Sequence, residues 1–294
     1  MIADRDLSRL AGATPTVPEI RRESLRGNAA LRIGLAIVIV LLALTMAAPV
    51  MSPYDPLSTG PAMLERPSLL HPMGTDALGR DLLTRVLFGA RVSLGAAMMT
   101  LLLIVTAGIT LGLLSGYYGG WADAFVMRLA DVVISVPTLI LALAVVGFFG
   151  AGLPALVFAL SGVWWVRYAR LTRGLVLTGR EHAFVEAARA LGAGDSRILL
   201  RHILPQIMRS VLVLATLDVG NVVLAVSALT FLGMGAQPPT PEWGAMINEG
   251  KDVLFVAPHV MLFPGLTLSL AVLGCNLLGE GLADEIGDLG SRTL

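Results

Sequence analysis

The sequence predicts an all-α integral membrane protein with six transmembrane helices. Charged residues make up 14% of the chain and its mean hydropathy is +0.79, whereas soluble domains carry about 25% charged residues. Six apolar stretches approach or exceed the roughly 20 helical residues that cross a bilayer core of about 30 Å. They cover residues 31–51, 92–115, 132–150, 152–168, 208–234 and 259–279. None alternates apolar and polar residues as membrane β-barrel strands do, so each is expected to be a helix.

The first stretch, residues 31–51, is expected to remain as the first transmembrane helix. It follows a polar tail at residues 1–30 and is longer than the apolar region of a cleaved signal peptide, which has about 7–15 residues. The single cysteine, Cys275, lies in the last apolar stretch, so the chain has no disulfide framework.

The placement of arginines predicts how the chain is oriented. Most of them lie in the tail 1–30 or between residues 167 and 209, and six helices put these two segments on one side of the membrane. Cytoplasmic loops collect Lys and Arg, so we expect both termini, including a tail at 283–294, in the cytoplasm. The outer side receives Arg66, Arg80, Arg85, Arg91 and Lys251. The net charge of zero argues against a nucleic-acid partner.

The first outer segment, residues 52–91, is predicted to be a periplasmic linker that ends in a short amphipathic helix. It is rich in Pro and Gly, and the apolar residues near its end fall on one helical face. These residues are Leu82, Leu83, Val86, Leu87 and Ala90. A basic hinge on the cytoplasmic side is the alternative, and the helix count disfavours it.

The second outer segment is residues 236–258. Pro238, Pro239 and Pro241 exclude a regular helix at those positions. Trp243 is of the residue type that settles at membrane interfaces.

The loop at residues 181–205 is predicted to form two short helices joined by a glycine turn. Residues 181–191 are good helix formers, with Ala188 and Leu191 on one apolar face. Gly192 is expected to end this helix in the left-handed conformation, which costs glycine little.

The second helix of the loop follows directly. Asp195 or Ser196 is expected to cap it, and Pro205 either ends it or starts the next span. Small residues in the first helix, Ala187 and Ala188, permit close approach of another backbone. The loop is therefore predicted to enter a groove on a partner protein.

This loop resembles the EAA loop of the permeases of ATP-binding-cassette (ABC) importers. The matching residues are Glu186-Ala187-Ala188, then Gly192 after three residues, then Leu204-Pro205 at the end of the segment. His202 stands where the family often has an aliphatic residue, a departure that the peptide and nickel branch tolerates. A solvated loop that matches by coincidence is disfavoured because several residue types agree across twenty positions.

Other segments are similar to the C-type permease subunit of dipeptide, oligopeptide and nickel importers. They are residues 74–94, 228–250 and 263–288. The resemblance implies a type I ABC importer permease (MetI-like) fold. In that fold, residues 92–282 would form a five-helix permease core in the bacterial inner membrane, with the coupling loop at 181–205.

The resemblance also implies partners and site residues. The partners would be a homologous second permease, two ATPase subunits and an external solute-binding protein. The ATPase-docking residues would be Glu186, Ala187, Ala188, Leu191, Gly192, Leu204 and Pro205. This chain would contain no catalytic residue and no cofactor, since ATP and Mg would be bound by the partner subunits.

Polar residues within the apolar stretches are candidates for lining a solute pathway, because they are expensive in lipid and usually face protein or water. Asp218 and Asn221 share a helical face by their i, i+3 spacing, and Asn276 lies in the last span. For Asp218 a structural hydrogen bond between helices is an equal alternative. Asp131 with Pro137 is expected to mark a structural kink.

The outer loop carries candidates for contact with the binding protein: Pro241, Glu242 and Trp243. The loop is expected to contact the binding protein or to form an external lid. A rigid re-entry at the interface, stabilised by the prolines and Trp243, is the alternative, and it is compatible with either role. Glu242 and Glu280 are expected to be solvated at the membrane edges.

Competing classes of protein fit less well. The chain has no P-loop pattern, no spaced His/Cys cluster to bind a metal, and no clustered nucleophile or acid for a membrane enzyme. An ion-coupled secondary transporter usually has internal repeats, and none is detectable. The predicted cargo is a di- or oligopeptide; nickel, a metal chelate or a glutathione-like compound is the alternative.

Overall fold

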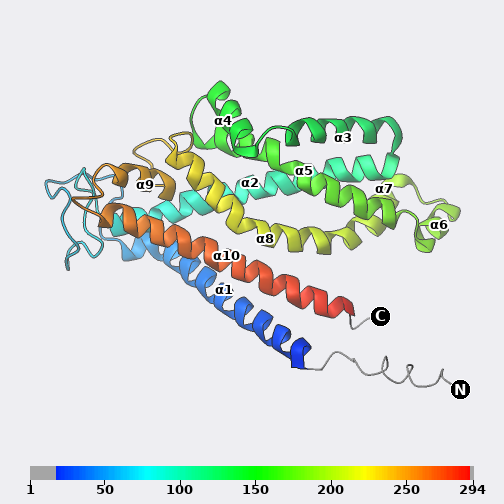
Figure 1. Cartoon of the computed structure of the whole chain (residues 1–294), viewed down its shortest axis with the longest axis horizontal. Coiled ribbons are helices and arrows are strands. Elements are labelled where there is room, and N and C mark those ends of the chain that lie inside the picture. The colour runs from blue at the N-terminus through cyan, green and yellow to red at the C-terminus, as the bar shows by residue number, and fades with distance from the viewer. Residues whose placement is uncertain (1–17, 292–294) are drawn as a thin grey trace, which may run out of the picture.

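The computed structural model describes residues 18–291 and the side chains of residues 29–285. The parts of the two predicted tails at residues 1–17 and 292–294 lie outside the described residues. The helices are α1 (Pro18–Met51), α2 (Leu82–Tyr118), α3 (Gly120–Ile134), α4 (Thr138–Phe149), α5 (Leu153–Gly179), α6 (Ala183–Ala190), α7 (Asp195–Ile198), the π-helix η1 (Leu199–Ile203), α8 (Leu204–Phe231), α9 (Trp243–Lys251) and α10 (His259–Ser291). The long helices run along the molecule, with α9 at one end and α6 and α7 at the other (Figure 1).

The predicted all-α membrane architecture is confirmed. Four described helices are long and apolar enough to span a bilayer: residues 29–51 of α1, α2, the continuous helix from Asp195 to Phe231, and α10. The bent pair of α3 and α4 passes the same test when the two helices are taken together, which would make it a fifth span. The 27 residues of α5 are also long enough, at about 1.5 Å per residue, although its arginines make it more polar.

The third predicted span, residues 132–150, is not one continuous helix, and this corrects the prediction. Helix α3 ends at Ile134, α4 begins at Thr138, and the two are bent by 94°. Pro137 lacks the N–H of a helical turn and its ring clashes with the preceding turn, while the residue before a proline is disfavoured in the helical region. The proline therefore breaks the helix rather than merely kinking it.

The segment between residues 167 and 209 is not one loop, which is a second correction. Helix α5 extends to Gly179 and includes Arg167, Arg170 and Arg173, which are spaced at i, i+3 and i+6. Arg170 pairs with Asp131 of α3 at 2.6 Å, and Arg173 pairs with Asp123 of α3 at 2.5 Å. The hydropathy falls at these arginines, but their aspartate partners on the neighbouring helix allow the helix to continue.

The amphipathic segment predicted before the second span forms the first turns of α2. Helix α2 begins at Leu82, and the carboxylate of Asp81 caps it by accepting a hydrogen bond from the backbone N–H of Thr84 at 2.8 Å. The same helix then continues without a break to Tyr118.

The linker is tied to α9 by a buried ionic cluster. Arg80 bonds Asp76 at 2.6 Å and Glu249 of α9 at 2.8 Å, and Arg85 bonds the same Glu249 at 3.0 Å. Asp76 and both arginines are buried. Because breaking a buried charge pair is costly, the cluster fixes the linker against α9.

A stripe of glycines brings α2 and α5 into backbone contact. Gly108, Gly112 and Gly116 recur every fourth residue on one face of α2 and lie against α5. A Cβ atom at Gly112 would lie 2.6 Å from both the carbonyl oxygen of Ala169 and the Cβ of Thr172. Small residues at such spacing permit the closest helix packing in membranes.

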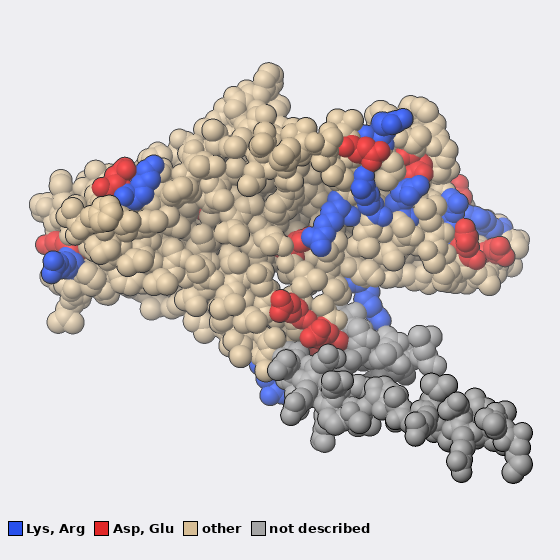
Figure 2. Space-filling model, viewed as in Figure 1, with Lys and Arg blue, Asp and Glu red and all other residues tan. Residues whose placement is uncertain are grey.

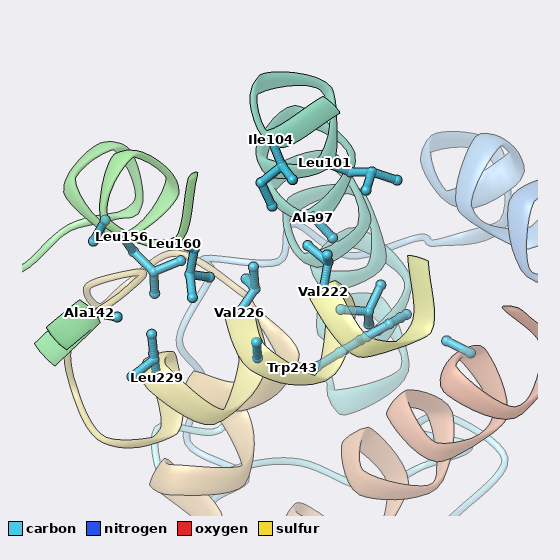
Figure 3. Close-up of a cluster of buried hydrophobic side chains, with 14 of the residues drawn as sticks. Ala97, Leu101, Ile104, Ala142, Leu156, Leu160, Val222, Val226, Leu229 and Trp243 are labelled. Carbon is cyan, nitrogen blue, oxygen red and sulfur yellow. The ribbon is translucent and has the colours of Figure 1, made fainter. Parts of the chain in front are cut away.

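Among the described residues, the largest apolar core lies where α2, α4, α5, α8, α9 and α10 meet. Figure 3 shows Leu156 and Leu160 of α5 facing Val226 and Leu229 of α8, with Trp243 of α9 near Val222, farther along α8. This core fixes the relative positions of α5 and α8, the two helices that carry the polar residues described next.

Candidate functional site

The loop between α5 and α8 forms a small packed unit at one end of the molecule. Val185 of α6 is fully buried and packs with Ile198, Ile203 and Tyr117 in one apolar cluster. The Tyr117 hydroxyl at the end of α2 donates a 2.7 Å hydrogen bond to the Asp195 carboxylate. The loop is therefore held against α2 as well as against α5 and α8.

The glycine turn of this loop has the predicted conformation, but the predicted cap is wrong. Gly192 has φ of +78°, in the left-handed region that favours glycine. The N-cap residue of α7 is Gly194, with no side-chain cap. Neither Asp195 nor Ser196 caps the helix, because both lie inside α7 and the Asp195 carboxylate bonds Tyr117 instead.

Pro205 starts the next span rather than ending the second loop helix. It occupies the first turn of α8, where its missing N–H costs little. The five preceding residues, Leu199–Ile203, form a π-helix, a widened turn of the kind found within α-helices. As a result the helix runs continuously from Asp195 to Phe231.

The residues predicted to dock a partner form a mainly exposed surface, which we call the docking surface. Glu186, Ala187, Gly192 and Pro205 are exposed, and Leu191 is 88% exposed. Ala188 and Leu204 are half-buried because they pack on the apolar cluster beneath. Leu200, which the sequence did not single out, adds a second exposed leucine.

A cavity of about 790 Å³ lies between α3, α4, α5 and α8. Its polar lining includes Arg167, Tyr168, Arg170, Asp218 and Asn221. Asp218 and Asn221 thus lie in the cavity, as their shared helical face predicted. The remaining lining is mainly apolar: Ile134, Thr138, Leu139, Val163, Trp164, Val166, Leu224, Ala225 and Ala228.

Asp218 is the centre of the polar cluster in this cavity. Its side chain is 7% exposed and bonds the Arg167 guanidinium at 2.8 Å. The Tyr168 hydroxyl donates to the other carboxylate oxygen at 2.9 Å, and the Asn221 amide donates at 3.4 Å. Asp218 therefore makes the hydrogen bonds between helices that one alternative expects, because it joins α8 to α5, and it also lines the cavity.

Asn276 does not line this cavity. It lies on α10 and packs against Gly220 of α8, so closely that a Cβ atom at Gly220 would overlap its side chain. Asn276 is therefore a contact between α8 and α10.

The outer-loop candidates are buried, which corrects two predictions. Pro241, Glu242 and Trp243 are all buried, so they offer no surface to an external protein, and Glu242 is not solvated. The Trp243 indole N–H donates to the carbonyl oxygen of Val86 at 3.0 Å. Its satisfied polar group allows the ring to enter the core instead of the membrane interface.

Glu242 joins three helices. Its carboxylate accepts hydrogen bonds from Ser93 of α2 at 2.8 Å and from Ser227 of α8 at 3.1 Å. The other oxygen caps α9 by accepting from the backbone N–H of Ala245 at 2.9 Å. Burial raises the pKa of Glu242 above its ordinary value of 4.5, against the opposing effect of the Ser93 hydrogen bond.

We expect the contribution of Glu242 to stability to fall as the pH rises. Because its pKa is higher in the folded state than in the unfolded state, folding binds the proton more tightly, and this gain is lost as the pH rises through the folded pKa. As the pH rises, the Tm of the detergent-solubilised wild type should therefore fall relative to the Tm of Glu242→Gln. The exposed Glu280→Gln reports the effect of removing a carboxyl group elsewhere, and a Tm difference for Glu242→Gln that is constant with pH contradicts the expectation.

Three cavity residues were missed by sequence reasoning: Arg167, Tyr168 and Arg170. The arginines were assigned to a loop because the apolar stretch ends near them. The available signal was the spacing of Arg167, Arg170 and Arg173 at i, i+3 and i+6, which places these three arginines near one helical face. Nothing in the sequence marked Tyr168.

The charged residues are distributed unevenly along the molecule. Figure 2 shows them gathered over α3, α5 and α6, with a small group at the opposite end and a broad uncharged region between. A polytopic helical protein with this distribution and an ion pair inside its apolar region has the character of a transport protein, because intramembrane charges usually mark a solute or ion path.

Comparison with known proteins specifies the class. The chain belongs to the family of the binding-protein-dependent transport system inner membrane component, which matches residues 108–286. Members of this family are permeases of ABC importers, so the chain is an inner-membrane transport subunit with the MetI-like fold.

The chain is similar over most of its length to a named subgroup of that family. The glutathione transport system permease protein GsiD of Pectobacterium atrosepticum is 43% identical over 270 residues, which cover 91% of this chain and 89% of that protein. The proteins of the same name from Escherichia coli and Shigella boydii are each 44% identical over 269 residues, covering 90% of this chain and 87% of theirs.

Proposed function

We propose that this chain forms half of the pore of an ABC importer for small peptides, a class that includes glutathione. Partner ATPase subunits would bind the docking surface and drive transport by hydrolysing ATP with Mg, so the chain itself needs no cofactor. The observation that carries the proposal is the exposure of Leu191, 88%, beside small Ala187 on a loop at the charged end. Exposed apolar residues that cluster outside the lipid region are typical of a protein interface.

The end of the molecule that carries α6 and α7 also indicates how the chain is oriented in the membrane. The described start of α1 and the end of α10 lie toward the same end as α6 and α7 (Figure 1). The arginines concentrate at this end (Figure 2), and the excess of basic residues favours the cytoplasm. Both termini and the docking surface would therefore face the cytoplasm.

The opposite end would face the external binding protein. Since Pro241, Glu242 and Trp243 are buried, the contact must use other residues. Leu69 and Leu70 of the linker and Phe255 and Val256 after α9 are highly exposed apolar residues at this end. We assign the binding-protein contact to them, with a homologous second permease completing the pore.

The cargo proposal rests on the relatives and on the cavity. The named relatives are glutathione permeases, and glutathione is a small peptide. The cavity of about 790 Å³ lies within the range of small-molecule sites, about 300–1,000 Å³. Its charged and apolar lining suits a solute with both ionic groups and side chains.

Uptake by proteoliposomes tests the proposal. The chain would be reconstituted with its partner permease, ATPases and binding protein, and uptake of labelled glutathione and trialanine followed. We expect vanadate, which blocks ATP hydrolysis, to stop uptake while an imposed proton gradient persists. Continued uptake would identify an ion-coupled transporter, and a binding protein that retains nickel chelates but neither peptide would contradict the cargo.

A further inference from the structure

The ion pair between Arg167 and Asp218 lies near the midpoints of two membrane helices. Arg167 is close to the middle of α5 (Leu153–Gly179) and Asp218 to the middle of α8 (Leu204–Phe231). Ionisable side chains at this depth are expensive, and they usually pair with one another at a solute path. The pair thus occupies the part of the chain where a solute must cross the apolar core.

Arg167 keeps most of its hydrogen-bonding capacity free. A guanidinium group has five N–H donors, and among the described residues only Nη1 of Arg167 has a hydrogen-bond partner, Asp218. The Arg167 side chain is 62% exposed and lines the cavity, whereas the Asp218 side chain is almost fully buried. Asp218, which itself accepts a hydrogen bond from the Tyr168 hydroxyl, therefore holds the guanidinium through Nη1, and the other N–H groups of Arg167 remain available to a ligand.

The cavity cannot face lipid. The break between α3 and α4 lies at its edge, where Ile134 and Thr138 belong to the lining. Helix ends leave backbone N–H and C=O groups without intrahelical partners, and such groups are not tolerated against hydrocarbon. Water or another protein chain must cover the break, as expected for a cavity that opens on a pore.

We propose that Arg167 binds the free carboxylate of the peptide cargo as it crosses the membrane, and that Asp218 and Tyr168 position the guanidinium for this contact. The available N–H groups of Arg167 match a carboxylate with two parallel hydrogen bonds. This assignment rests on the proposed function. It adds the group that is recognised and the residue that recognises it.

Substitutions at Arg167 test the assignment in the reconstituted complex, with whichever of glutathione and trialanine the wild type transports. Arg167→Gln should lower uptake about tenfold or more, the equivalent of one lost charge-assisted hydrogen bond. Arg167→Lys keeps the charge beside Asp218 but loses the planar fork, so it should remain several-fold below wild type. The ATPase activity stimulated by the loaded binding protein should change little in either variant.

Two controls separate recognition from folding. Arg173→Gln removes an arginine of the same helix that pairs with Asp123 outside the cavity, and it should retain wild-type uptake. The double variant Arg167→Gln, Asp218→Asn leaves no unpaired charge, and it should assemble normally yet fail to transport.

Full uptake by Arg167→Lys, or an equal loss in Arg173→Gln, would show that the pair serves only structure and would overturn the assignment. Normal transport by the double variant would overturn it as well. By contrast, a wild-type complex that transports neither peptide, or transports without ATP hydrolysis, contradicts the proposed function itself.

Discussion

Ala187→Arg is expected to abolish co-purification of the ATPase subunit while the permease still inserts and folds. Ala187 is exposed on α6 beside the exposed Leu191, so a long charged side chain there would block close approach without disturbing the chain's own packing. Ala188 is a less informative position because it packs on the apolar cluster beneath the loop. The recovered ATPase should fall about tenfold or more, the effect of losing roughly 1.4 kcal/mol of binding free energy.

Ala187→Ser is the matched control for the docking surface, since it introduces a polar atom but keeps the side chain small. Affinity purification of a tagged permease from membranes measures both variants against wild type. If Ala187→Arg retained the ATPase in normal yield, α6 would not be the docking element.

Gly112→Leu is expected to destabilise the protein by about 3 kcal/mol, the upper end of the usual cost of overpacking. The new Cβ would lie 2.6 Å from the Ala169 carbonyl oxygen and from the Thr172 Cβ on α5. Both atoms belong to or adjoin the backbone of a helix, so relief requires α2 and α5 to separate. Tm of the solubilised protein and the yield of folded material by gel filtration measure the effect.

Gly95→Leu provides the control within the same helix. A Cβ atom at Gly95 would meet nothing within 4 Å, and replacing glycine by leucine improves helix propensity by up to about 1 kcal/mol. The variant should therefore be as stable as wild type or slightly more so. If Gly95→Leu lowered the Tm as much as Gly112→Leu, the close approach of α2 to α5 would not be the cause of the destabilisation.

The class of fold and the two short helices with a glycine turn between α5 and α8 could be predicted from the sequence because both depend on local signals. Runs of apolar residues set the positions of the long helices, and α1 ends at Met51 as expected. The turn at Gly192 depends on the conformational freedom of one residue. The glycines at 108, 112 and 116 were equally readable, since their four-residue spacing is a known packing pattern.

Features that depend on distant residues could not be predicted. Glu242 looked solvated because its partners Ser93 and Ser227 are ordinary residues far away in the sequence, and only the fold brings them together. Similarly, Arg167 and Arg170 lowered the hydropathy enough to resemble a loop. Their aspartate partners on other helices, which keep them inside the membrane region, become visible only in three dimensions.

Under the proposed function, the unbroken helix from Asp195 to Phe231 would connect the end of the molecule that docks the ATPase to the middle of the membrane. Asp195 and Asp218 are separated by about 34 Å along it, at 1.5 Å per residue. If a moving partner tilted α7, Asp218 would also move, because both belong to one continuous helix. Asp218 forms an ion pair with Arg167, which lies on the separate helix α5. The contact between Arg167 and the carboxylate of the cargo would then weaken and strengthen with each cycle of ATP hydrolysis. This coupling would travel through one rigid helix and would need no chain of side-chain contacts.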